Sequence, residues 1–175
     1  MEASYPVTEP NPRWRRWARN AGKGAAVLAL FLVLRAFTQR GIASGAAPPL
    51  VGSDLDGHAI SLGDLRGKSV MVHFWATWCP VCEAEIASVD ALARSHAVLT
   101  VATSSGHARE IRADMEKRGV SFPVVVDPEG ELARAWGVRA FPTTFFVTPN
   151  QEIRLAETGF TTAFGFRARL WLSGP

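Results

Sequence analysis

The chain has 175 residues, of which 47% are hydrophobic and 20% are charged. A chain of this length and composition is expected to fold around a core as about one domain, which excludes an intrinsically disordered protein. The net charge of +3 is unevenly distributed. Residues 1–45 hold seven lysines and arginines against two acids, a balance of +5, whereas residues 46–175 hold twelve against fourteen, a balance of −2. The main part of the chain lacks the basic excess typical of nucleic-acid binding, so we expect no nucleic-acid partner.

The first part of the chain has the organisation of an export signal. A basic segment, residues 1–20, precedes the uncharged run Gly24–Leu34. A basic flank ahead of an apolar run keeps the positive side in the cytoplasm. A helix over residues 21–39 is about long enough for the roughly 30 Å hydrocarbon core, whereas the uncharged run alone is too short. We expect an uncleaved signal anchor over residues 21–39, and the alternatives are a cleaved signal and an amphipathic or buried helix.

The composition changes after this segment. The run Gly45-Ala46-Ala47-Pro48-Pro49 is typical of a linker, so we predict a linker over residues 40–48 and a domain over residues 49–175. If the anchor crosses the inner (cytoplasmic) membrane once, the domain lies on its periplasmic side.

Hydrophobic periodicity predicts alternating strands and helices in the domain. The segment Ser69–Ala76 is almost entirely apolar, as expected of a strand buried on both faces, and a helix with one apolar stripe fits Pro80–Ser95. The other predicted strands are Ala59–Leu62, Ala97–Ala102, Phe122–Val126, Thr143–Val147 and Glu152–Ala156, and the other predicted helices are Ala108–Arg118, Leu132–Trp136 and Ala163–Leu172. This order predicts an α/β fold with a mixed central sheet flanked by helices.

The two cysteines, Cys79 and Cys82, lie at the junction of the buried strand and the helix after it. Because they are three positions apart, they close almost no loop and cannot form a disulfide scaffold. Zinc needs a second close pair of ligands, which the four histidines do not supply, so we expect no metal. A cysteine in the first turn of a helix faces free N–H groups and the positive end of the dipole, which favour the thiolate. We therefore predict a redox-active dithiol without a bound cofactor, in which Cys79 attacks and Cys82 resolves; two inert core cysteines are the alternative.

The run Phe74–Cys82 (FWATWCPVC) resembles the active site of thioredoxin-fold proteins. More narrowly, it is similar to the membrane-anchored bacterial TlpA/ResA group and, within it, to suppressor-of-copper-sensitivity proteins. The resemblance extends from about Pro48 to the end of the chain. It implies a thioredoxin fold, exchange with protein thiols and disulfides, and an integral-membrane thiol donor.

The family's second landmark is a cis-proline ahead of a strand, which Phe141-Pro142-Thr143 resembles. The resemblance implies that Pro142 is cis and lies against the dithiol, while the backbone of Phe141 pairs with a substrate chain. An ordinary trans proline is the alternative. We expect Trp78 to form a lid over Cys79.

Two titratable residues are candidates for supporting roles. Glu85 lies three positions after Cys82 and matches the acidic residue that TlpA/ResA-type proteins carry beside the dithiol, where it can handle a proton. Its alternative is a solvated helix carboxylate. His73 stands where thioredoxins carry a buried aspartate, and is either a substitute base or a hydrogen-bonded core residue.

Two other functions remain open. A thiol peroxidase shares the fold but needs a threonine three positions before the reactive cysteine, where this chain has Ala76. A copper metallochaperone of the Sco type resembles C-x-x-x-C with a distal histidine, whereas two residues separate the cysteines here. The resemblance to the TlpA/ResA group, by contrast, implies that the dithiol acts in the reducing direction.

Overall fold

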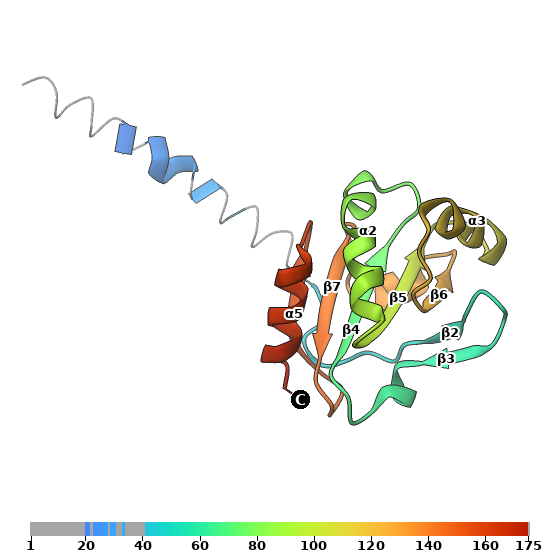
Figure 1. The fold of residues 1–175 in the computed structure, drawn as a ribbon. Coiled ribbons are helices and arrows are strands. Elements are labelled where there is room, and N and C mark those ends of the chain that lie inside the picture. The colour runs from blue at the N-terminus through green and yellow to red at the C-terminus, as the bar shows by residue number, and fades with distance from the viewer. Residues whose placement is uncertain (1–19, 22, 28, 31–32, 34–40, 175) are drawn as a thin grey trace, which may run out of the picture. The chain divides into compact units, whose positions relative to one another are not determined.

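The computed structural model describes residues 20–21, 23–27, 29–30, 33 and 41–174. One compact unit begins at Gly41 and contains the whole predicted domain (Figure 1). The anchor predicted over residues 21–39 lies partly outside the described residues, and those of its residues that are described are helical. The basic segment 1–20 lies outside them except for its last residue. Among the described residues, no helix combines the length and the apolar character needed to cross a membrane.

The domain is built on a six-stranded sheet and a separate hairpin. The strands are β1 (Gly45–Ala46), β2 (Val51–Ser53), β3 (Ala59–Ser61), β4 (Val70–Trp75), β5 (Ala97–Thr103), β6 (Val124–Asp127), β7 (Thr143–Val147) and β8 (Glu152–Thr158). The helices are α2 (Pro80–Ala93), α3 (Ala108–Arg118), α4 (Glu131–Ala135) and α5 (Ala163–Leu172), with a short 3₁₀ helix at Leu62–Leu65. The sheet order is β1-β8-β7-β4-β5-β6, and β2 pairs with β3. Strands β4, β5 and β6 are parallel and β7 is antiparallel to β4, so the predicted mixed sheet is confirmed.

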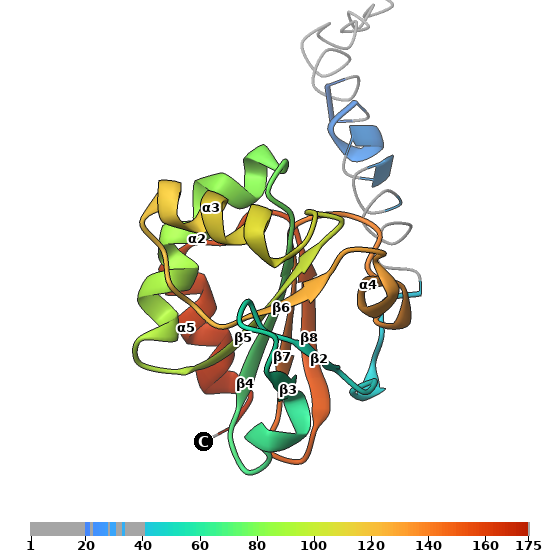
Figure 2. The ribbon, with the colours of Figure 1, turned by 90° about the vertical axis from the view of Figure 1, so that its right-hand side faces the viewer.

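Strand β4 lies at the centre because its side chains are buried on both faces of the sheet. Met71 and Trp75 belong to the core beneath α2, α3 and α5, whereas Val72 and Phe74 belong to the core beneath α4. Helices α2, α3 and α5 cover one face and α4 the other (Figure 2). The C-terminal end of this central strand leads directly into the two cysteines.

Several predicted elements are confirmed, and some bounds differ for local reasons. The helices at 108–118 and 163–172 and the strand at 143–147 have the predicted bounds. The strand predicted at Phe122–Val126 begins at Val124 and ends at Asp127. Pro123 has no N–H to donate, although its carbonyl accepts the Thr100 N–H in the first hydrogen bond between β5 and β6. The strand predicted at Ala59–Leu62 ends at Ser61, whose side chain caps the 3₁₀ helix.

Most of the linker predicted over residues 40–48 packs on the domain, from Gly41 onwards. Strand β1 pairs with the edge of β8, and the N–H of Ala43 donates to the carbonyl of Trp136 at 3.0 Å. Small side chains are typical of linkers, but they also let a backbone approach a folded surface closely. Gly137 illustrates this approach: its φ is +68°, and a Cβ placed there would overlap the carbonyl of Gly41.

The close approach at Gly137 predicts a measurable loss of stability in G137A. We expect the free energy of unfolding to fall by about 2–4 kcal/mol, because the methyl group adds a backbone clash to the cost of a positive φ. The control is G57A, where φ is +85° but no atom of the described residues lies within 4 Å of the new Cβ, and a loss of about 1 kcal/mol is expected. Urea unfolding measures both. Equal losses in the two variants would show that segment 41–47 does not pack as described.

Candidate active site

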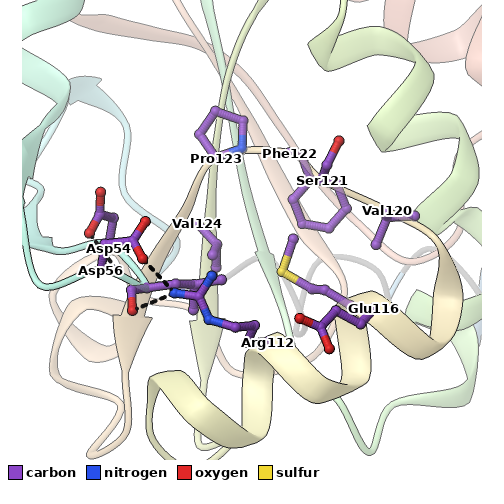
Figure 3. Close-up of a pocket in the computed structure, with 11 residues that line it drawn as sticks. Asp54, Asp56, Arg112, Glu116, Val120, Ser121, Phe122, Pro123 and Val124 are labelled. Atoms are coloured by element: carbon purple, nitrogen blue, oxygen red, sulfur yellow. Dashed lines mark hydrogen bonds and ion pairs between the residues drawn. The ribbon is translucent and has the colours of Figure 1, made fainter.

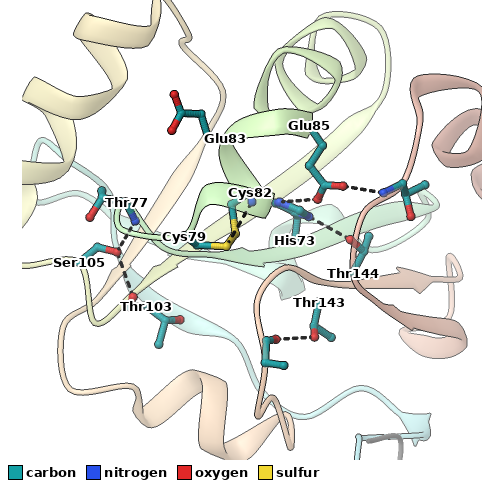
Figure 4. Close-up of a disulfide and its surroundings, with 12 residues drawn as sticks. His73, Thr77, Cys79, Cys82, Glu83, Glu85, Thr103, Ser105, Thr143 and Thr144 are labelled. Atoms are coloured by element: carbon teal, nitrogen blue, oxygen red, sulfur yellow. Dashed lines mark hydrogen bonds and ion pairs between the residues drawn. A yellow bond between two sulfur atoms is a disulfide. The ribbon is translucent and has the colours of Figure 1, made fainter. Parts of the chain in front are cut away.

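The two cysteines lie where β4 ends and α2 begins, and they form a disulfide (Figure 4). Cys79 is the N-cap of α2, and its Sγ accepts the backbone N–H of Cys82 at 3.1 Å. Pro80 occupies the first helical turn, where its missing N–H costs no hydrogen bond. Cys79 is 5% exposed and Cys82 1%. Both side chains are therefore largely covered, and Cys79 is the more accessible of the two.

The turn ahead of Cys79 is held by the loop that follows β5. The N–H of Thr77 donates to Ser105 Oγ at 3.0 Å, and Ser105 Oγ donates to the carbonyl of Thr103 at 2.9 Å. The indole of Trp78 donates to the carbonyl of Ser104 at 2.9 Å. Ser104 and Ser105 were not identified from the sequence, since no motif there indicates that this loop lies beside the dithiol.

Trp78 and Phe141 form an aromatic edge beside the dithiol. The side chain of Trp78 is 61% exposed, and its ring meets that of Phe141 edge to face at a centroid distance of 5.7 Å. Trp78 is thus oriented by Phe141 and Ser104 while much of its surface stays open to solvent. Its role as a lid over Cys79 stays a prediction.

The Phe141–Pro142 peptide bond is cis, as predicted. The carbonyl of Pro142 accepts the N–H of Gly159 at 2.9 Å, which fixes the loop after β8 beside it. Across the described part of the chain, the N–H and carbonyl of Phe141 make no hydrogen bond. The pairing of this backbone with a substrate chain, which the resemblance implies, stays a prediction.

A buried polar cluster lies behind the dithiol, between α2 and β7 (Figure 4). His73 is paired with Thr144 in the sheet register, and its Nδ1 lies 2.9 Å from Thr144 Oγ1. Its Nε2 lies 3.6 Å from Glu85 Oε1. Glu85 Oε2 accepts the backbone N–H of Thr161 at 2.7 Å. His73 and Glu85 are both buried, so the alternative of a solvated carboxylate at Glu85 is wrong.

Burial decides the charge of this pair. It raises the pKa of Glu85 from 4.5 to about 7, although the hydrogen bond from Thr161 opposes the shift. It lowers the pKa of His73 from 6.5 to about 3. His73 is therefore neutral near pH 7 and the contact is not an ion pair. Among the described residues, Oε1 of Glu85 has no hydrogen-bond partner, so a proton on it faces Nε2 of His73.

Thr144 and Thr161 are functional candidates that the sequence did not single out. The sequence held a usable signal for Thr144. Side chains alternate along the strand after the cis-proline, so Thr144 could be placed on the same face of the sheet as His73 of the central strand. For Thr161 the sequence held no such signal, since its contact with Glu85 depends on where the loop after β8 runs.

A group of two carboxylates and an imidazole in the described residues has the kinds of side chain that bind metal ions. Asp54, Asp56 and His58 lie on the β2–β3 hairpin with ligand atoms within 4.8 Å of one another. Asp56 already pairs with Arg112 at 2.7 Å beside a pocket of about 310 Å³ (Figure 3). Asp54 accepts the N–H of His58 at 2.9 Å. Arg112 of α3 and the backbone N–H groups of the hairpin account for these two carboxylates.

Reversible disulfide chemistry needs a position that stabilises a thiolate and a second thiol within one turn of it. The start of α2 supplies both, and the central sheet and cis-proline loop hold them. The fold and the site therefore define a thiol–disulfide exchange protein with a thioredoxin fold.

Comparison with known proteins agrees with this class. Residues 44–156 match the AhpC/TSA family, and the chain belongs to it. Thiol-disulfide oxidoreductase ResA of Geobacillus kaustophilus is 35% identical over 132 residues, which cover 72% of this chain and 76% of that protein. ResA of Bacillus subtilis is 36% identical over 120 residues, which cover 66% of this chain and 67% of that protein. Among solved structures, the exposed lipoprotein thioredoxin of Streptococcus pneumoniae is similar to this chain, with a TM-score of 0.61 and 29% identity. The match covers 71% of this chain and 98% of that protein. The chain is a thiol–disulfide oxidoreductase, and its resemblance to the TlpA/ResA group is confirmed at this level.

The buried pair predicts opposite pH dependences of stability. The carboxyl of Glu85 ionises near 4.5 when unfolded and near 7 when folded, so rising pH in that window lowers the free energy of unfolding, by up to about 3 kcal/mol. The imidazole of His73 protonates near 6.5 when unfolded and near 3 when folded, so falling pH in that window also lowers it. Between about pH 4.5 and 6.5 the two effects oppose each other.

Single variants separate the two effects. Relative to the parent chain, we expect the stability of E85Q to rise as pH increases from 4.5 to 7, and that of H73N to fall as pH increases from 3 to 6.5. Urea unfolding at stepped pH measures both differences, and subtracting the parent removes the contributions of other groups. Differences with the same sign would contradict the assignment of two neutral buried partners.

Proposed function

We propose that the chain is an extracytoplasmic enzyme that reduces protein disulfides through the Cys79–Cys82 dithiol. The observation that carries the proposal is the position of Cys79 Sγ at the N-cap of α2, where it accepts the N–H of Cys82. The same N–H and the helix dipole stabilise a thiolate there.

The reaction follows from this arrangement. The Cys79 thiolate attacks a substrate disulfide, forms a mixed disulfide and releases one substrate sulfur as a thiolate. Cys82, after losing its proton, attacks the Cys79 sulfur, which releases the second substrate thiolate and closes the Cys79–Cys82 disulfide. Two electrons pass from the dithiol to the substrate. The backbone of Phe141 pairs with the substrate chain beside Pro142 during the exchange.

Glu85 is the group that takes the proton from Cys82. Its raised pKa near 7 lets it accept and return a proton at ordinary pH. His73 is a positioning residue in this scheme, since its Nδ1 is held by Thr144 and its Nε2 faces the carboxyl. A histidine of such low pKa stays neutral, so the carboxyl and not the imidazole carries the exchanged proton.

The two alternative functions have less support. Ala76 lies where a thiol peroxidase needs threonine, and the partner of Cys79 is one helical turn away in the same chain. The Sco-type spacing of three residues between cysteines is absent. Dithiol exchange accounts for both cysteines without a metal or a peroxide.

The proposed location rests on the N-terminal sequence. A basic segment ahead of an apolar run is typical of a signal anchor, with the domain on the periplasmic side of the cytoplasmic membrane. The pneumococcal structure is described as an exposed lipoprotein. An exported dithiol becomes oxidised unless electrons are supplied, so we propose an integral-membrane thiol donor as a partner. Within the TlpA/ResA group, the FWATWCPVC run favours likeness to the suppressor-of-copper-sensitivity protein ScsD.

Trapping tests the exchange chemistry and the location together. With C82S, the mixed disulfide cannot be resolved, so partners should accumulate on Cys79 and be recovered from salt-washed membranes. C79S is the matched control and should trap few partners. Equal trapping by the two variants would exclude Cys79 as the attacking residue. Partners found only in the cytosolic fraction would exclude the location while leaving the chemistry intact.

The reducing direction predicts the reduction potential. Val81 lies between Pro80 and Cys82 and offers neither charge nor hydrogen bond to a thiolate, whereas strong oxidants gain their power from a stabilised thiolate. We therefore expect an intermediate potential, slow reduction of insulin in the presence of dithiothreitol, and poor oxidation of reduced ribonuclease. Equilibration with glutathione measures the potential. A value near about −120 mV, that of a strong periplasmic oxidant, would exclude the reducing direction.

A further inference from the structure

The last residue of α3, Arg118, contacts the chain on both sides of Cys79. Its Nη2 donates to the carbonyl of Thr77 at 3.1 Å, two residues before the cysteine. Its Nη1 lies 3.3 Å from Oε2 of Glu83, four residues after the cysteine. The side chain is only 17% exposed, and its Nε donates to Asp114 Oδ2 at 2.7 Å. One guanidinium therefore links α3 to the turn that carries the nucleophile.

The positive charge of Arg118 lies beside the N-terminus of α2, where a cation is unusual. The N-terminus of a helix is already positive, so a carboxylate there is favourable and a cation is not. Glu83 alone would satisfy the helix, but its negative charge opposes a thiolate at Cys79. Arg118 compensates for Glu83 and Asp114, and these two carboxylates raise the pKa of Arg118 in turn. The guanidinium stays charged throughout any thiol titration.

We propose that Arg118 is a positioning residue for the dithiol, which fixes the Thr77 carbonyl and offsets the carboxylates that would otherwise disfavour the Cys79 thiolate. The proposal rests on Cys79 as the attacking thiol. It assigns a redox role to a side chain outside the CPVC motif, the cis-proline loop and the buried pair.

The test is the pH profile of alkylation of the reduced full-length chain by iodoacetamide, with Cys79 modification assigned by fragment mass spectrometry. In R118Q, we expect a higher pKa at Cys79 and a thiolate fraction about three- to tenfold lower at pH values below that pKa. R118K keeps the charge and should restore most of the reactivity. A purely structural role for Arg118 would lower the unfolding midpoint without moving this profile.

Arg112 provides the matched control on the same helix. Its Nη2 donates to the carbonyl of Leu55 and pairs with Asp56, so it links α3 to the β2–β3 hairpin (Figure 3). R112Q therefore removes an arginine with equivalent contacts away from the dithiol turn, and should leave the Cys79 pKa unchanged. A shift in R112Q as large as that in R118Q would overturn the proposal.

A second variant keeps the proposal testable if R118Q does not fold. E83Q removes the exposed carboxylate and should lower the pKa of Cys79, the opposite direction to R118Q. An unchanged profile in E83Q, or a shift in the same direction as R118Q, would overturn the proposal. Among the described residues, the other titratable groups around the dithiol are Asp114 and Lys117 on α3 and the buried pair of Glu85 and His73, and all variants retain them. Since alkylation needs no protein substrate or donor, a wrong direction or location would leave this result intact.

Discussion

The hydrogen bond from the Cys82 N–H to Cys79 Sγ is the interaction on which the site depends. It exists because a buried parallel strand ends where a helix begins, and because Pro80 allows that helix to start immediately after the first cysteine. The free N–H groups of a helix start are normally satisfied by oxygen. Here a sulfur takes that place, so the helix end that needs a cap and the sulfur that needs stabilisation as a thiolate satisfy each other.

Behind this cap, burial changes the pKa values of a carboxyl group and an imidazole. Glu85 lies in the core with one oxygen held by Thr161 and the other facing His73, so its pKa moves close to 7. The neighbouring histidine moves the opposite way and stays neutral. The folded protein thus holds a neutral pair where the unfolded chain would hold two charges near pH 5 to 6. Burial of the pair therefore costs stability and leaves a carboxyl group with a pKa of about 7 behind the disulfide.

The turn before Cys79 is held from outside the motif by two segments that are distant in sequence. The loop after β5 binds the Thr77 N–H and the Trp78 indole, and Arg118 binds the Thr77 carbonyl. These contacts hold the backbone just before Cys79, so that α3 and the β5–α3 loop contribute to the geometry of the site although they carry no cysteine. The aromatic pair of Trp78 and Phe141 then forms the open side.

The sequence by itself determined the pair of cysteines and most elements of the sheet, because each has a local signal: the spacing of the cysteines or an unbroken apolar run. The cis bond at Pro142 was predicted only from the resemblance to thioredoxin-fold proteins, since most X–Pro bonds are trans. The sequence did not determine that residues 41–47 pack on the domain, because a segment rich in glycine and alanine is equally typical of a linker and of a backbone that packs closely on a folded surface. Only the tertiary structure decided that Glu85 is buried against His73 and that Arg118 reaches Thr77. The sequence around a charged residue on a helix does not indicate which element packs over it. The burial, the pKa and the ion pairing of such a residue are therefore set only when distant segments pack together.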